Sequence, residues 1–372
     1  MALMSRSAHT SSFALVVALF CVLAAATARA SATIVIDDSD PAGQGLNDPT
    51  SFVPVGGNAA TTLGAARLGV FQRAAWLWGA ALTSHVPIHV DTQFVALGCS
   101  VASAVLASTG ANTVHRNFMG APIANIWYPQ ALANSLADAD LDPMTADIGT
   151  EFNSALGGAG CMPGTTWYLG FDGHPGAGQI DMLTVVLHEL SHGLGFQTYE
   201  DLSTGAELLG FADVFMVGIR QLNATSPALL EMSDAQRAAA DVSDPNLYWA
   251  GANVQDAASS YSAGLVGGHV RLYAPSAIEA GSSVSHYAAA LTPNELMEPI
   301  YTGPNHDLTL TADLMRDLGW PPVASPPMVP ALPNPMRWLL GLGLVAFAAK
   351  RLRSTVDRPM SRLATVGRIR PP

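Results

Sequence analysis

The sequence predicts an α+β protein in which a mixed, twisted sheet packs with helices in the N-terminal half of the chain. The stretch ATIVIDDSD (32–40) is a plausible strand, and alternating apolar positions predict another strand in VPIHVDTQFVAL (86–97). Apolar positions at helical spacing predict one helix over 65–82 and another over 183–194, which carries two histidines. The patterns beyond residue 195 are shorter, so we expect a C-terminal half that is mostly irregular or helical.

Residues 1–30 are predicted to be a secretory signal peptide. A weakly basic start is followed by the short apolar run FALVVALFCVLAAA and by the small-residue cleavage motif ARA at 28–30. The protein is therefore expected outside the cell or at its surface, although an uncleaved anchor is the alternative. Cys21 would leave with the signal, and the remaining pair, Cys99 and Cys161, predicts one disulfide in an oxidising compartment, with two free thiols as the alternative.

The charge of the chain divides sharply near residue 320. Residues 31–320 contain seven arginines, no lysine and 28 aspartates plus glutamates. So acidic a body argues against nucleic-acid binding and suits a soluble exported protein. Residues 321–372 are basic instead, with eight lysines plus arginines and a single acidic residue.

Three short patterns organise the C-terminal half. MSDAQRAAAD (232–241) indicates a short element, and HVRLYAPS (269–276) a strand that ends at a proline. LTLTADLMRDLGW (308–320) predicts a helix with a threonine as candidate N-cap and Gly319 at its end.

The predicted helix over 183–194 carries the motif HELSH. His188 and His192 are one helical turn apart, about 5.4 Å along the axis, so both rings project from one face as two ligands of a tetrahedral zinc would. Glu189 stands beside the first histidine, where it could take a proton from a zinc-activated water that attacks a carbonyl group. A purely structural histidine pair is the alternative.

The residues after this motif indicate where a third ligand comes from. Gly195 follows in HGLGF, which resembles the metzincin peptidases, whose zinc helix stops at such a glycine. The position of the usual third histidine is Thr198 here, so the compact pattern fails. SSVSHYAAALTPNELMEP resembles instead the leishmanolysin-like branch of metzincins, in which the third histidine lies far downstream of the helix, before a methionine turn.

This resemblance covers about residues 60–320 and implies one catalytic Zn²⁺ held by His188, His192 and His286, with Met297 as an apolar floor. Alternatives for the third ligand are His269 or, on a following helix, Glu207 or Asp213. The remaining histidines are expected at the surface or in loops: His85, His89, His115, His174 and His306. Whether Tyr301 assists catalysis is left open.

The C-terminal end is predicted to be a separate segment. PPVASPPMVPALPNP (321–335) is a proline-rich linker. Residues 336–372 contain an apolar run of twelve residues, 338–349, before a basic cluster. This run is shorter than the ~20 residues that span a membrane. The segment resembles the C-terminal sorting signals of exported bacterial proteins, which implies a transient membrane anchor and processing machinery as a partner, with an amphipathic or disordered tail as the alternative.

The sequence therefore predicts an exported zinc metalloendopeptidase that hydrolyses protein or peptide substrates. Its two catalytic subdomains would be residues 31–195 and 196–320, with the zinc between them. The alternative is a zinc-containing surface or binding module without proteolytic activity. Glu189 argues against that alternative, because a structural zinc site has no use for a general base.

Overall fold

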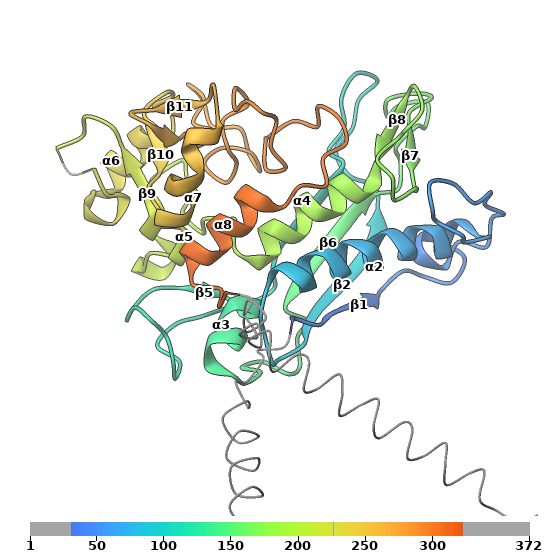
Figure 1. The fold of residues 1–372 in the computed structure, drawn as a ribbon, viewed down its shortest axis with the longest axis horizontal. Coiled ribbons are helices and arrows are strands. Elements are labelled where there is room, and N and C mark those ends of the chain that lie inside the picture. Colours follow the sequence, from blue (N-terminus) through green and yellow to red (C-terminus); the bar gives the residue numbers. More distant parts are fainter. Residues whose placement is uncertain (1–30, 226, 323–372) are drawn as a thin grey trace, which may run out of the picture. The chain divides into compact units, whose positions relative to one another are not determined.

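The computed structural model describes residues 31–225 and 227–322, all of which belong to one compact unit (Figure 1). The predicted signal peptide, the apolar C-terminal run and all but the first two residues of the predicted linker lie outside the described residues. Among the described helices, none is long and apolar enough to cross a membrane. The protein mixes α-helices and β-strands, as the sequence predicts.

The main sheet has four strands in the order β1-β2-β6-β3. Their bounds are β1 Ile34–Asp38, β2 Ile88–Val95, β6 Ile148–Asn153 and β3 Ala107–Ala111. β1 and β6 both pair with β2 in parallel, whereas β3 pairs with β6 antiparallel, so the sheet is mixed. β3 is the last strand in this order, with one side paired to β6.

Two helices, α2 (Leu63–Ala81) and α4 (Met182–Leu194), pack against the sheet and against each other (Figure 1). Alternate side chains of β2 are buried, from Ile88 to Phe94, as expected for a strand with one covered face. The indole nitrogen of Trp78 on α2 donates a hydrogen bond of 3.1 Å to the carbonyl oxygen of Leu187 on α4. These contacts fix α4 firmly in the core.

Smaller elements complete the N-terminal part of the described chain. They are η1 Gly45–Asn47, β4 Val114–His115, β5 Tyr128–Pro129, α3 Gln130–Ala137, β7 Thr166–Tyr168 and β8 Gln179–Asp181. Cys99 and Cys161 form a disulfide pair with Cα atoms 5.1 Å apart, as the sequence predicts. The pair connects the segment before β3 to the segment after β6, so it closes the end of that antiparallel ladder.

Beyond residue 195 the elements are short and are joined by long irregular segments. They are η2 Leu208–Gly210, α5 Val214–Gly218, β9 Ile219–Gln221, η3 Leu229–Glu231, α6 Asp234–Ala240, β10 Leu247–Trp249, α7 Ala252–Ala257, η4 Ala258–Ser260, β11 Leu265–Val266, β12 His269–Val270 and α8 Thr309–Leu318. No strand of this part exceeds three residues within the described chain.

Two details of the C-terminal half differ from the sequence prediction. The strand expected over 269–276 is reduced to the two residues of β12, because the next residues make isolated bridges to different partners: Arg271 pairs with Tyr248, and Leu272 with Tyr287. The predicted threonine cap of α8 is also wrong, because the residue at the cap position is Leu308. Gly319 does end this helix, with a φ of 111°.

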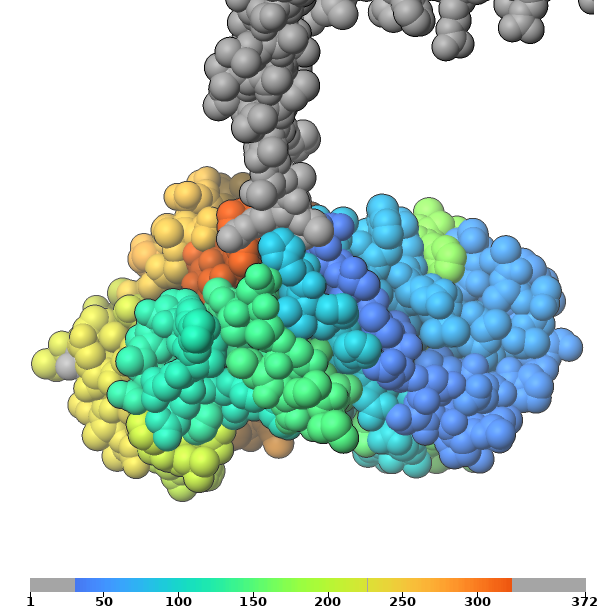
Figure 2. All heavy atoms as spheres, turned by 90° about the horizontal axis from the view of Figure 1, so that it is seen from below, coloured from blue at the N-terminus to red at the C-terminus, as the bar shows by residue number. Residues whose placement is uncertain are grey.

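Both ends of the described body meet at one residue, Thr83. Ser31 forms an antiparallel β-bridge with Thr83, and the hydroxyl of Thr83 donates to the carbonyl oxygen of Pro322 at 3.3 Å. Figure 2 views the face on which these segments come together.

Candidate metal centre

Helix α4 positions two of the three candidate ligands. Its N-terminus is capped by Asp181, whose carboxylate accepts from the backbone N–H of Thr184 at 2.7 Å. The helix ends at Gly195, whose φ of 127° lies where a residue with a Cβ is strained. His188 and His192 therefore lie on its last two turns, as the sequence predicts.

The third histidine comes from a loop of the C-terminal half and meets the first two. The Nε2 atom of His188 lies 3.1 Å from that of His286 and 3.2 Å from that of His192. The ligand atoms of these three histidines all lie within 4.8 Å of one another. In the described part of the chain, no other group of three or more such side chains is placed to hold a metal ion. Any two ligand nitrogens of a tetrahedral zinc site are separated by about 3.3 Å, given Zn–N bonds of about 2.0 Å.

The other ring nitrogen of each histidine faces a backbone oxygen. The acceptors are Leu296 for His188, Phe196 for His192 and Ser282 for His286, each at 2.8 Å. Because a carbonyl oxygen can only accept, each Nδ1 must carry the hydrogen, and each neutral Nε2 then presents a lone pair. The backbone thus selects the tautomer in which three lone pairs converge, an arrangement typical of metal-ligating histidines.

Burial keeps these imidazoles neutral. It lowers the pKa of His188, lowers that of His192 to about 3 and lowers that of His286 well below the usual value. Around neutral pH, three unprotonated nitrogens therefore share one small space. Such lone pairs repel one another unless a cation lies between them, so the residues fit a metal ion.

Two contacts hold the loop that carries His286. The backbone N–H of Thr198 donates to the hydroxyl of Ser285 at 3.2 Å, directly beside the third histidine. The carbonyl oxygen of His286 itself accepts from the N–H of Tyr273 at 2.9 Å. Thr198 occupies the position where the compact metzincin pattern would place a histidine, and here it anchors the segment that supplies the ligand instead.

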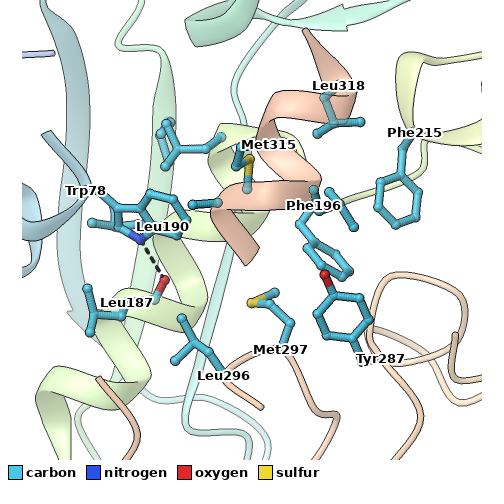
Figure 3. Close-up of a cluster of buried hydrophobic side chains, with 14 of the residues drawn as sticks. Trp78, Leu187, Leu190, Phe196, Phe215, Tyr287, Leu296, Met297, Met315 and Leu318 are labelled. Carbon is cyan, nitrogen blue, oxygen red and sulfur yellow. Dashed lines mark hydrogen bonds between the residues drawn. The ribbon is translucent and has the colours of Figure 1, made fainter. Parts of the chain in front are cut away.

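Met297 is fully buried in the hydrophobic cluster between α4 and α8. Figure 3 shows its side chain in this cluster, near Leu296 and Tyr287. Its carbonyl oxygen accepts from the N–H of Tyr287 at 2.8 Å, and the preceding carbonyl, that of Leu296, is the partner of His188. Hydrogen bonds therefore connect the turn around Met297 to His188 and to Tyr287, the residue after His286.

Glu189 lies on α4 beside this cluster but is not part of it. The residue is only 7% exposed, and this burial raises the pKa of its carboxyl group to about 7. The nearby hydroxyl of Thr109 on β3 acts in the opposite direction and lowers that pKa. A carboxyl group that titrates near neutrality can both accept and return a proton.

The alternative third ligands lie elsewhere. His269 stacks on Tyr248, with ring centroids 4.5 Å apart. Asp213 caps α5, where it accepts from the N–H of Met216 at 2.9 Å. Glu207 lies 3.5 Å from the guanidinium group of Arg237.

The histidines expected at the surface or in loops have mixed environments. His85, His89 and His174 are largely exposed, with side-chain exposures of 56%, 46% and 83%. His115 is half-buried in β4, and burial lowers its pKa. His306 lies in a loop, and its Nε2 is 2.8 Å from the buried carboxylate of Asp181 at the start of α4.

Sequence reasoning missed this cluster at the N-terminus of α4. The hydroxyl of Tyr301 accepts from the backbone N–H of Asp181 at 3.0 Å, and Asn305 donates its N–H to the hydroxyl of Thr184 at 2.9 Å. The segment after Met297 therefore runs along α4 toward its beginning. The hydroxyl of Tyr301 thus contacts Asp181 in the structure. No sequence pattern predicts this hydrogen bond between residues 120 positions apart.

Comparison with known proteins adds no assignment: no family model, no curated protein and no solved structure matches the chain. The function must therefore be argued from the site itself. Its geometry defines a group of three imidazoles that could hold one metal ion, with the buried carboxyl group of Glu189 beside it.

Proposed function

We propose that the protein is a zinc-dependent metalloendopeptidase in which His188, His192 and His286 hold the metal. The single observation that carries this proposal is the convergence of three Nε2 atoms whose Nδ1 atoms are all bonded to backbone carbonyls. Three imidazoles suit zinc, and a set of three protein ligands leaves a fourth position open, as in catalytic rather than structural zinc sites.

Glu189 supports hydrolysis as the reaction. Zinc bound by three histidines supplies a Lewis acid and lowers the pKa of water at its open position to about 7. The Glu189 carboxylate would accept a proton at its Oε atoms and return it to the leaving nitrogen of the peptide. Its burial on α4 would hold it in place for both transfers.

The strand next to Glu189 supports an extended peptide as the substrate. β3 contacts α4 and is the last strand of the main sheet, so one row of its backbone N–H and C=O groups is unpaired within the sheet. A peptide could add to this row as a further strand, which would bring its backbone past Thr109 and Glu189. Recognition through the backbone suits an endopeptidase, because it requires no chain end.

We further propose membership of the metzincins, close to their leishmanolysin-like branch. Gly195 at the end of the zinc helix, a distant third histidine and the buried Met297 turn support this assignment. The predicted export and cell-surface location, with a processed C-terminal anchor, remain part of the same proposal.

Cleavage of a protein substrate by the wild type and by the Glu189→Gln variant tests this function. We expect the variant to retain about one equivalent of zinc and to lose activity on the order of 10³-fold, since general acid–base groups contribute this much. Glu231→Gln, which changes an exposed glutamate, is the matched control and should be fully active. Equal cleavage by the wild type and Glu189→Gln would contradict the mechanism, and cleavage by neither would favour the non-proteolytic binding module.

A further inference from the structure

Two buried carboxylates lie away from the histidines, in the C-terminal half. Glu200 follows the turn after α4 and is 7% exposed, and Asp241 follows α6 and is fully buried. All four of their carboxylate oxygens are buried without a hydrogen-bond partner. Buried charges are normally paired or coordinate a metal, so the pair needs a counter-charge when both carboxyl groups are ionised, unless the two share a proton.

Arg237 of α6 is the nearest positive charge, and its donors are used elsewhere. Its Nε donates to the carbonyl oxygen of Gly205 at 2.7 Å and one terminal nitrogen to that of Met232 at 2.6 Å. The other terminal nitrogen binds the carboxylate of Asp234. The closest oxygen of Glu200 is 3.7 Å from Nε, beyond hydrogen-bond distance.

The balance of charge is therefore negative at this point. Arg237 is shared among Asp234, Glu207 at 3.5 Å and Glu200 at 3.7 Å, so its single positive charge faces these three carboxylates as well as that of Asp241. Burial, followed by the charge of Asp241, raises the pKa of Glu200, and burial also raises the pKa of Asp241. Both directions indicate that the ionised pair is costly as it stands.

We propose that Glu200 and Asp241 form a second metal site, which binds a hard divalent cation of the Ca²⁺ type. A divalent ion would offset the negative charges of Glu200 and Asp241 while Arg237 keeps its present partners. The donors are all oxygens, which favour Ca²⁺ over zinc, and backbone carbonyls and water would complete the six to eight ligands that Ca²⁺ takes. The site does not depend on the function proposed for the histidines.

The position of this pair suggests what the ion would hold together. The turn from Asp201 to Ala206 closes with a hydrogen bond of 2.9 Å from the N–H of the first to the carbonyl oxygen of the second. Glu200 precedes this turn, whereas Asp241 ends α6. An ion between them would fasten the turn to α6, next to the existing bond from Arg237 to Gly205.

The test is a Ca²⁺ titration of the full chain, with its histidine site loaded with zinc and other divalent ions removed. Calorimetry should give about one Ca²⁺ per chain, and Tm should rise by about 5 °C at 100 times the dissociation constant. The isosteric variant Glu200→Gln/Asp241→Asn should lose both responses and keep its zinc. Asp234→Asn, which changes an exposed partner of the same arginine, should still bind Ca²⁺.

Two results would overturn the site. If the wild type binds no Ca²⁺ and its Tm falls as the pH rises from about 6 to 9, the pair shares a proton instead. If the double variant still binds Ca²⁺, the ion lies elsewhere. Should the double variant fail to fold, a crystal of the wild type grown with Ca²⁺ decides, because the ion must lie about 2.3–2.6 Å from oxygens of both residues.

Discussion

The two parts of the described chain are stabilised in different ways. In residues 31–195, β2 pairs with a strand on each side, and α4 packs on the sheet through regular apolar positions. In residues 196–322, carboxylates organise the backbone instead: Asp317 alone accepts from the N–H groups of Asn253 and Val254 and from the indole of Trp249.

This difference divides the candidate metal centre between two kinds of structure. The regular part supplies His188 and His192, whose spacing follows from helix geometry alone. The irregular part supplies His286, whose position depends on contacts such as that between Thr198 and Ser285. All three histidines therefore come together only if the C-terminal half is correctly folded around His286.

The largest expected effect comes from removing the ligand that the irregular part contributes. In His286→Ala, two ligands remain on α4, and we expect zinc affinity to fall more than about 10²-fold. Loss of a residue that only hydrogen-bonds to a metal ligand already lowers affinity by up to about 10²-fold. Peptide cleavage should disappear with the metal. His269→Ala, which changes the histidine stacked on Tyr248, is the control and should keep its zinc. Full zinc occupancy in His286→Ala, measured by metal analysis, would refute the ligand set.

The next effect sharpens the comparison from the side of the sheet. Cys99 and Cys161 are 62 positions apart, and a cross-link of that span stabilises by about 4 kcal/mol in the chain-entropy model. Cys99→Ser/Cys161→Ser should lose about this much free energy of unfolding in urea. The wild type under reducing conditions should behave like the variant. Two alkylatable thiols in the unreduced protein would contradict the pairing.

Buried carboxylates should make the C-terminal half sensitive to pH. Burial raises the pKa of Glu295 from 4.5 to about 7, and Tyr261 donates to one of its oxygens while the other has no partner. Because the folded pKa lies above the unfolded one, the cost of ionisation is absent below about pH 4.5, grows as the pH rises to 7 and is constant above. Glu295→Gln should therefore gain about 3 kcal/mol above pH 7 and nothing at pH 4. Denaturant unfolding at both pH values measures this, and an equal gain at both would contradict the assigned cause.

The smallest effect compares the ends of two helices. Gly195→Ala combines a φ of 127° with a Cβ that would lie 3.0 Å from Leu318, whereas Gly319→Ala meets no atom within 4 Å at a φ of 111°. We expect a loss of about 2 kcal/mol for the first and about 1 kcal/mol for the second. Only Gly195→Ala should also weaken zinc binding, because the next carbonyl orients His192. Thermal unfolding and zinc titration of both variants check this, and equal zinc affinities would contradict it.

The sequence predicts the regular part well because its signals are local. The helix over 65–82 is confirmed by α2 and that over 183–194 by α4, since each has apolar residues at helical spacing along its whole length. The two strands in the same half are confirmed by β1 and β2. That the structure brings His286 to this helix agrees with an expectation that rested on resemblance rather than on any local pattern.

The irregular part resists such prediction because its elements are fixed by distant partners. Nothing near Glu200 or Asp241 in the chain marks them as buried neighbours, and Tyr301 reaches the start of α4 across 120 positions. The two-residue strand β12 was mispredicted for the same reason. At the start of α8 the contacts are local, because the N–H of Thr309 donates to Asp307 at 2.9 Å. Local propensity has little influence where single hydrogen bonds to remote groups decide the backbone path.

The junction at Thr83 determines how mechanical load would enter this body. Ser31 and Pro322 contact the same residue, so a pull between the segments that flank the body is applied across a single point. The bridge to Ser31 and the hydroxyl contact to Pro322 would carry that tension first. Until they part, the sheet and the three histidines lie off the line of force, and stretching the flanking chain leaves the metal centre undeformed.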